Sequence, residues 1–209
     1  TIFIVTADHG DEFMDHGGLG HGHTMYQELL RVPLVVSGDG IPRGVRVPGL
    51  VRGIDVGATI AALAHLEVPD TFDGRSLLPM IRAAAAGEST REAPSDPREV
   101  RVRLRDDEAA FSFAWNGQLR SVTTDDLHLM ADTERGTFEL YDVRHDPNGQ
   151  DDLVGTVGRP FRRLRRKLED YEYDLNEVER RSAALRRGGL APAVGERPAA
   201  QLRALGYVE

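Results

Sequence analysis

The stretch TIFIVTADHG, residues 1–10, is the most informative part of the sequence about the fold. Its β-branched and aromatic residues follow one another without a polar break, which is typical of a strand covered on both faces in a mostly parallel sheet. A second run of this kind, VPLVVS, spans residues 32–37. Two helical patterns follow: Asp55 can cap a helix that runs to about Ala64 and buries a face with Val56, Ile60 and Leu63, and a second short helix begins after Ser76. This alternation predicts an α/β architecture in which helices flank the sheet.

Composition excludes several classes of protein. The 209 residues include 34 acidic and 26 basic ones and carry a formal charge of −8, so we expect neither nucleic acid nor an anionic membrane surface as a partner. No cysteine is present, which excludes disulfides and thiolate metal sites within the chain. The apolar runs are all shorter than the roughly 20 residues that a bilayer span requires, so we expect no membrane span.

The second half of the chain has a different pattern. Short alternating segments occur at 100–104, 110–115, 119–122, 127–130 and 138–141. Asn116-Gly117 is a hairpin signal, so we predict a small antiparallel sheet of these segments. Residues 159–185 predict a helix packed on that sheet, because apolar side chains recur along it at spacings of three and four. Residues 84–97, rich in Ala, Glu, Ser and Pro, are interpreted as a linker between two domains, 1–83 and 98–209.

The chemistry is concentrated just after the first strand. Four of the seven histidines lie between positions 9 and 23. A strand that delivers a carboxylate and an imidazole at its carboxyl end places them where ligands bind in open α/β sheets. Asp8 and His9 are therefore candidate ligands of one metal ion. The alternative is that Asp8 is a turn carboxylate and His9 an ordinary polar residue at the end of a strand.

Several ordered motifs resemble one family. They are TADHG at 6–10, TMYQ at 24–27, RVPL at 31–34, DGRSLLP at 73–79, ELYDV at 139–143 and LGYV at 205–208. In this order they resemble the C-terminal portion of sulfatases of the alkaline phosphatase superfamily. The resemblance implies that residues 1–83 are the C-terminal part of the α/β catalytic domain. The chain begins inside a strand without an initiator Met, so we expect it to be a fragment.

The resemblance also implies roles for individual residues. Asp8 and His9 inherit a divalent metal site, with calcium as the usual metal of sulfatases and manganese or zinc as alternatives that suit an imidazole. Many sulfatases have a Lys where this chain has Gly22, and the only lysine here is Lys167. His21 or His23 is then expected to donate to an anionic oxygen or to protonate the leaving alkoxide.

Other polar residues of this loop are interpreted as structural. His16 matches no ligand of the family, and Asp11, Glu12 and Asp15 are interpreted as solvated residues or as supports of the ligands. Tyr26, Glu28 and Arg31 are expected to hold the loop against the sheet. Trp115 is interpreted as a core residue.

The family nucleophile is missing from the sequence. No Cys/Ser-x-Pro-x-Arg signature occurs, so we expect the chain to be inactive alone and to require the N-terminal half of the same protein as its partner. The first expectation is hydrolysis of a small-molecule or glycan sulfate ester. A phosphate or phosphonate ester is the alternative, because His23-Thr24 resembles the His-Thr at which two-metal phosphatases bind their second ion. A non-catalytic metal-binding module is the third possibility.

Overall fold

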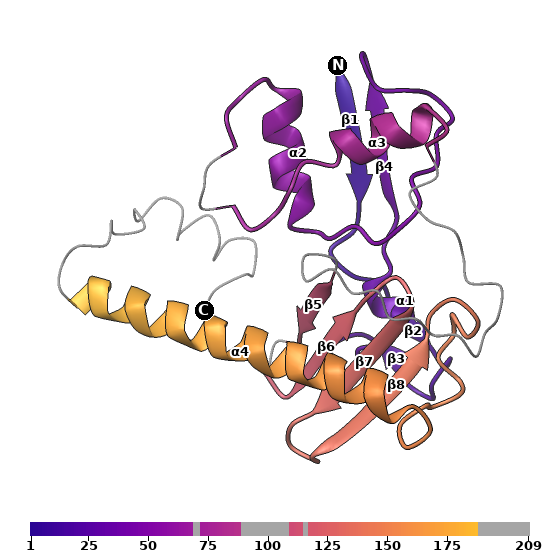
Figure 1. Cartoon of the computed structure of the whole chain (residues 1–209), viewed down its shortest axis with the longest axis vertical. Helices are drawn as coiled ribbons and strands as arrows, with labels where there is room; N and C mark the ends of the chain where they lie inside the picture. Colours follow the sequence, from indigo (N-terminus) through magenta and orange to yellow (C-terminus); the bar gives the residue numbers. More distant parts are fainter. Residues whose placement is uncertain (69–71, 89–108, 115–116, 188–209) are drawn as a thin grey trace. The chain divides into compact units, whose positions relative to one another are not determined.

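The computed structural model describes residues 1–68, 72–88, 109–114 and 117–187. The chain divides into two compact units, Thr1–Arg165 and Arg166–Glu209. Figure 1 shows the order of helices and strands along the chain. Among the described residues, no helix combines the length and the apolar character needed to cross a membrane.

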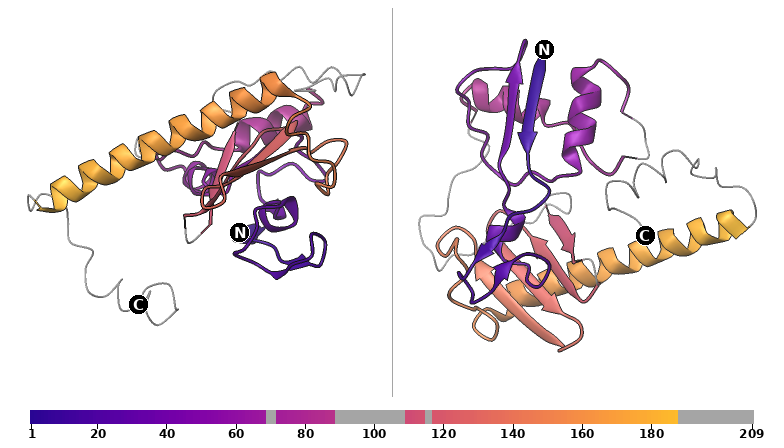
Figure 2. Two further views of the ribbon diagram at one scale, coloured as in Figure 1. Left: turned by 90° about the horizontal axis from the view of Figure 1, so that it is seen from below. Right: turned by 180° about the vertical axis from the view of Figure 1, so that it is seen from behind.

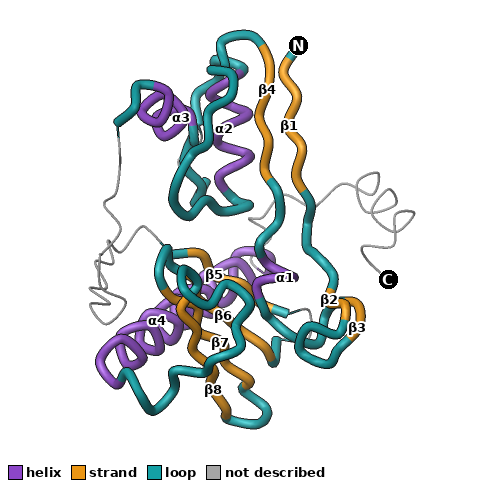
Figure 3. The backbone as a smooth tube through the Cα atoms, turned by 90° about the vertical axis from the view of Figure 1, so that its right-hand side faces the viewer, coloured by secondary structure: helices purple, strands orange, loops and turns teal. Residues whose placement is uncertain are grey.

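The two long apolar runs form strands β1 (Ile2–Thr6) and β4 (Leu34–Gly38). They pair with each other, with Ile4 opposite Val36. Between them lie a hairpin of two short strands, β2 (Glu12–Phe13) and β3 (Leu19–Gly20), and the single-turn helix α1 (Gln27–Leu30). Figure 3 shows β1 and β4 side by side. The segment that carries the candidate site is therefore the connection between two paired strands.

The sheet differs from the sequence prediction in direction and in cover. β1 and β4 run antiparallel, because the segment between them reverses the chain. Side chains alternate across the two strands, and Ile4, Val36 and the helical residue Val56 meet around one small gap. The opposite face carries exposed apolar side chains: Phe3 (64%), Val5 (58%) and Val35 (54%). Within the described residues only one face of this pair of strands is covered, and no parallel pair of strands occurs there.

Both expected helices of the first part are present, as α2 (Asp55–Leu63) and α3 (Leu78–Ala85). Asp55 was expected to cap α2 but is its first residue, and its buried carboxylate accepts hydrogen bonds from the backbone N–H groups of Arg52 and Arg75, both at 2.9 Å. The face of α2 that is buried carries Ala58 and Thr59, whereas Ile60, predicted to face inward, is 51% exposed. The helix is therefore rotated relative to the predicted apolar face.

The predicted antiparallel sheet is confirmed. Four strands follow one another in sequence order, each antiparallel to the next: β5 (Ala110–Phe113), β6 (Leu119–Thr123), β7 (Leu127–Asp132) and β8 (Thr137–Asp142). Figure 2 shows this sheet from two further sides. The long helix is α4 (Gly158–Arg187). Its first turns pack on the sheet, since Leu164 is fully buried and the ring of Phe161 meets Phe138 edge to face, with centroids 5.6 Å apart.

Some predictions fall outside the described residues. The strand expected at 100–104, Trp115, Asn116 and the motif at 205–208 all lie there. Most of the linker at 84–97 lies there as well, so the division into domains 1–83 and 98–209 stays a prediction.

Candidate active site and metal centre

Asp8 and His9 follow β1 directly, and their side chains face each other. Oδ2 of Asp8 lies 3.9 Å from Nε2 of His9, and Oδ1 accepts the backbone N–H of His9 at 3.0 Å. That backbone hydrogen bond lowers the pKa of Asp8 below its ordinary value, which keeps the carboxylate ionised at neutral pH. The next residue, Gly10, is fastened to α1, because its N–H donates to the carbonyl of Leu29 at 2.8 Å. Helix α1 thus fixes the point at which the chain leaves β1.

His21 returns to this pair from the far strand of the hairpin. Its ring lies on the ring of His9, with centroids 4.0 Å apart. Nδ1 of His21 is 2.8 Å from Oδ1 of Asp11. His9, Asp11 and His21 each offer a ligand atom within 4.8 Å of the others, and we call these three residues the exposed cluster. Their side chains are 43%, 47% and 56% exposed, so the group is open to solvent and to a ligand.

Glu12 is the next residue after Asp11, yet its carboxylate is completely buried. Oε1 accepts the backbone N–H groups of His16 and Gly18 at 3.2 and 2.8 Å, and Oε2 accepts the hydroxyl of Thr24 at 3.0 Å. Burial alone would raise the pKa of Glu12, but the bonds from Gly18, Thr24 and His16 outweigh it, and the pKa lies below its ordinary value. Glu12 is therefore an ionised anchor that holds the loop 16–24 together.

His23 contacts this anchor and not the exposed cluster's carboxylate. Its Nε2 is 3.2 Å from Oε2 of Glu12, and its Nδ1 is 3.3 Å from the carbonyl oxygen of His21. Gly18 makes room for this arrangement, because a Cβ built there would lie only 2.4 Å from Nε2 of His23. Both nitrogens of His23 thus face acceptors within the protein.

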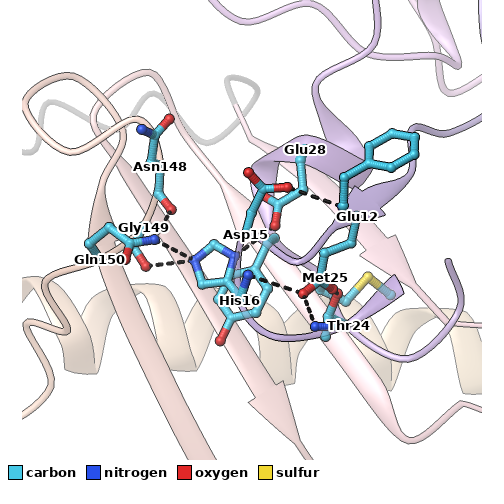
Figure 4. A network of polar contacts seen from close by, with 12 residues as sticks. Glu12, Asp15, His16, Thr24, Met25, Glu28, Asn148, Gly149 and Gln150 are labelled. Atoms are coloured by element: carbon cyan, nitrogen blue, oxygen red, sulfur yellow. Dashed lines mark hydrogen bonds and ion pairs between the residues drawn. The ribbon is translucent and has the colours of Figure 1, made fainter. Parts of the chain in front are cut away.

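Glu12 also belongs to a second group of titratable side chains, with His16 and Glu28. Nδ1 of His16 is 2.7 Å from Oε1 of Glu28, and Nε2 is 3.0 Å from the carbonyl oxygen of Gly149, as Figure 4 shows. Burial by itself would lower the pKa of His16. The hydrogen bonds to the carboxylate of Glu28 and the carbonyl of Gly149 together have the larger and opposite effect, so the pKa lies above its ordinary value. Glu12, His16 and Glu28 also offer ligand atoms within 4.8 Å of one another, and we call them the buried cluster.

The buried cluster is tied to the four-stranded sheet by Tyr26. The rings of His16 and Tyr26 stack at 3.5 Å with an interplanar angle of 9°. The hydroxyls of Tyr26 and Tyr141 both donate to Oε2 of Glu139, at 2.9 and 2.6 Å. Partial burial and the carboxylate of Glu139 raise the pKa of Tyr26 to about 12, so it remains a donor. Tyr26 therefore ties the loop to the four-stranded sheet, and not to the first sheet as expected, while Glu28 acts within the loop through His16.

A buried histidine of β7 makes a second connection to the site loop. His128 is 1% exposed, its Nε2 lies 2.8 Å from the carbonyl oxygen of Met25, and its Nδ1 lies 2.8 Å from the hydroxyl of Thr123. Burial lowers the pKa of His128 to about 4, so the ring is neutral. A neutral ring with Nε2–H donates to Met25 and accepts from Thr123. Met25 directly follows His23-Thr24, and the sheet thus fixes the chain at that point.

The structure places Asp8 beside His9 and the ring of His21 on that of His9, and it directs His23 to Glu12. Sequence reasoning missed the position of Glu12 and the contribution of His128. The hairpin register, in which Glu12 pairs with Gly20, is the feature that separates Glu12 from its neighbour Asp11. No local pattern marks His128, because its partner lies 103 residues away.

Comparison with known sequences agrees with this organisation. Residues 16–93 match the family model described as N-sulphoglucosamine sulphohydrolase, C-terminal. The chain is 32% identical over 172 residues to the uncharacterized sulfatase YidJ of Escherichia coli. This match covers 81% of the chain and 31% of YidJ. It is 35% identical over 88 residues to arylsulfatase K of Mus musculus, covering 42% of the chain and 16% of the relative. The chain spans about a third or less of the length of these curated relatives.

Solved structures share the fold. A protein solved in complex with its substrate D-glucosamine-2-N,6-O-disulfate matches 84% of this chain and 35% of its own, with a TM-score of 0.65 and 22% identity. A phosphonate monoester hydrolase of Agrobacterium radiobacter matches 86% of this chain and 35% of its own, with a TM-score of 0.54 and 22% identity. The α/β fold class expected for this portion of the superfamily is thereby confirmed. With its ordered motifs, its family model and its relatives in agreement, the chain belongs to the sulfatase family.

Proposed function

We propose that the whole protein containing these 209 residues is a metal-dependent hydrolase of sulfate esters, and that this chain supplies part of its metal site. The observation that carries the proposal is a pair of contacts after β1, one between Asp8 and His9 and one between the rings of His9 and His21. A carboxylate, an imidazole that can bind metal and a further imidazole are exposed together there. A metal ion held by Asp8 and His9 would supply the positive charge that an anionic ester requires.

The donor set fits a divalent ion. Asp8 is ionised, and Nδ1 of His9 lies 2.9 Å from the carbonyl oxygen of Gly10, which leaves Nε2 for a metal. A ligating histidine commonly has its other nitrogen held by a backbone carbonyl in this way. Asp8 and His9 are the proposed ligands, with calcium as the metal of sulfatases and manganese or zinc as alternatives. A bound ion would act as a Lewis acid toward the sulfate group and activate a nucleophile.

The other residues of the chain orient the substrate side of the site. His21 and His23 are the two candidate catalytic residues, and we propose that one of them balances negative charge on the transferred group or the leaving oxygen. Glu12 and α1 hold the loop on which they lie. The substrate we propose is a sulfate ester of a sugar, since one relative of this fold was solved with D-glucosamine-2-N,6-O-disulfate.

The nucleophile and the remaining ligands are proposed to come from the N-terminal half of a sulfatase. The exposed face of Phe3, Val5 and Val35 supports this, because adjacent apolar side chains of this size are normally covered by a further layer. We therefore expect the 209 residues by themselves to hydrolyse no sulfate ester.

The test measures hydrolysis of 4-nitrophenyl sulfate and of a 6-O-sulfated glucosamine by the whole protein, with metal analysis of the same sample. We expect turnover that EDTA abolishes, and loss of both metal and activity in the Asp8→Ala and His9→Ala variants. Full activity of both variants would overturn the proposed site. Metal binding without hydrolysis of any ester would favour the non-catalytic module.

A phosphate or phosphonate ester is the second candidate. It is favoured by Gly22 at the usual position of the lysine, and by the fold shared with a phosphonate monoester hydrolase. Against a second metal ion at His23, both of its nitrogens already face protein acceptors. The kcat/KM values for three esters of 4-nitrophenol, the sulfate, the phosphate and the phenylphosphonate, decide between the two candidates.

A further inference from the structure

We propose that the two histidines have different tasks: His21, oriented by Asp11, faces the substrate, and His23 is a framework residue held by Glu12. Asp11 is then a positioning residue. This inference rests on the proposed function and deepens it, because it assigns the residue that replaces the missing lysine and names the carboxylate that aims it.

The contact with Asp11 fixes the orientation of the His21 ring. Nδ1 of His21 donates a hydrogen bond to Oδ1 of Asp11, and the two atoms are 2.8 Å apart. A carboxylate can only accept, so Nδ1 carries a hydrogen and points to Asp11, and Nε2 lies on the other side of the ring. The ring rests on His9, the proposed metal ligand, at a centroid distance of 4.0 Å. His21 is 56% exposed, and its Nε2 is thus available to an ester bound at Asp8 and His9.

The contacts of His23 leave it no such freedom. Its Nε2 faces a carboxylate with no exposed surface, and its Nδ1 faces the backbone carbonyl of His21. Turning His23 toward a substrate would remove one partner from the buried charge of Glu12, which is unfavourable in a low-dielectric position. The absence of a Cβ at Gly18 allows His23 to approach Glu12 in the first place.

Gly22 explains how two histidines only two residues apart acquire different surroundings. In an extended strand, residues i and i+2 point to the same face. Gly22 has φ = +88°, a left-handed conformation that L-residues with a Cβ rarely adopt, and this breaks the alternation between His21 and His23. The sequence His21-Gly22-His23 therefore sends one imidazole to Asp11 and the other to Glu12.

This division has a chemical consequence for the ester. A His21 ring with hydrogens on both nitrogens keeps Nδ1–H on Asp11 and donates Nε2–H to an oxygen of the bound sulfate group. The arrangement follows the logic of a histidine held by an aspartate, in which the carboxylate fixes the tautomer and orientation of the ring. Asp11 therefore acts on the substrate only through His21.

The first experiment records the side-chain nitrogen signals of the histidines in the whole protein by two-dimensional ¹H–¹⁵N NMR. Calcium and then inorganic sulfate are added as probes. We expect sulfate to shift the Nε2 signal of His21 and to leave that of His23 in place, and Asp11→Asn to change the Nδ1 signal of His21. A sulfate-induced shift at His23 alone would overturn the proposal, whether or not the protein hydrolyses esters.

The second experiment compares kcat and KM for aryl sulfates whose leaving phenols differ in acidity. We expect His21→Gln to lower kcat about 10²-fold and Asp11→Asn about 10-fold, with larger losses for poorer leaving groups. Asp11→Glu is expected to recover part of the loss. Asp15→Asn is the matched control, since Asp15 is a carboxylate of the same loop that accepts the N–H of Phe13, and it should leave kcat unchanged.

His23→Gln completes the comparison. It is expected to lower the melting temperature while kcat falls less than in His21→Gln. A larger loss of kcat in His23→Gln at an unchanged melting temperature would overturn the assignment, as would loss of bound metal in His21→Gln. If the wild-type protein hydrolyses no sulfate ester, the proposed function fails, and the NMR result still decides which histidine meets the anion.

Discussion

The exposed cluster and the buried cluster contain the same kinds of side chain and have opposite surroundings. Each has imidazole and carboxylate groups whose ligand atoms lie within 4.8 Å of one another. In the exposed cluster the side chains are 43–56% exposed, whereas those of Glu12, His16 and Glu28 are 0%, 10% and 19% exposed. In the buried cluster, the polar atoms are hydrogen-bonded to backbone groups, to the hydroxyl of Thr24 and to one another. Depth of burial, and not residue type, therefore distinguishes a group that supports the fold from a group that a ligand can reach.

The largest effect is expected from the removal of His9, a residue of the exposed cluster. We expect His9→Ala to lower kcat/KM by about 10³-fold, or about 4 kcal/mol, because a metal ligand would be lost. Its free energy of unfolding in the presence of EDTA should stay within about 0.5 kcal/mol of the wild type, as is usual for exposed side chains. Enzyme kinetics and urea denaturation measure the two quantities. A large loss of stability with intact activity would contradict the assignment of the two clusters.

Removing Glu12 should lower the free energy of unfolding, which the removal of His9 should leave nearly unchanged. Glu12→Ala leaves the N–H groups of His16 and Gly18 and the hydroxyl of Thr24 without their buried acceptor. We expect a loss of about 3–4 kcal/mol in the free energy of unfolding. Urea denaturation measures it, and Asp15→Ala, in the same loop, should change it by less than about 0.5 kcal/mol. Equal effects of the two substitutions would show that Glu12 is no anchor.

His128 is a buried imidazole of a third kind, because among the described residues it contacts a hydroxyl and a backbone carbonyl and no carboxylate. Its folded pKa of about 4 lies below the unfolded value of 6.5, so the unfolded chain binds the proton first as the pH falls. Stability should therefore decrease between pH 6.5 and 4, by roughly 3 kcal/mol in all. His128→Gln, which can still donate to Met25, should remove this part of the pH dependence. Denaturation at a series of pH values tests both statements.

The smallest effect is expected from His16. Its contribution to stability is lost as the pH rises, whereas that of His128 is lost as the pH falls. Because its folded pKa is raised, its contribution to stability is complete below the unfolded pKa of 6.5 and is lost as the pH rises through the folded pKa. Denaturation between pH 5.5 and 9 should show this decline in the wild type and a flatter curve in His16→Gln. A decline of the same size in the variant would assign the pH dependence to another group.

Much of the fold could be predicted because the patterns that specify it are local. Alternation and turn residues identified β6, β7 and β8 to within two residues at each end. The relative direction of β1 and β4 could not be predicted. An apolar run indicates that a strand is buried, but it does not indicate which strand pairs with it or in which direction. The side that α2 buries was also missed, because Ala58 and Thr59 are small and do not stand out beside Ile60.

The candidate site could be predicted in its composition but not in its connections. The order of strand, carboxylate and imidazole identified Asp8 and His9, and the density of histidines identified His21 and His23. Nothing in the sequence distinguishes Asp11 from Glu12, which are adjacent acids. Their difference arises from the pleat of β2, which turns Glu12 inward, and from partners that close on it from Gly18 and Thr24.

The contact between His16 and Gly149 spans 133 residues of chain, while that between Asp11 and His21 spans only 10. Closing a long loop costs more chain entropy than closing a short one, so contacts of such different range do not form together. As the polypeptide emerges from the ribosome, the Asp11–His21 pair can assemble before the four-stranded sheet has been translated. The contact with Gly149 must follow the synthesis of that sheet, so a nascent chain forms the local contact of the candidate site first and its long-range contact later.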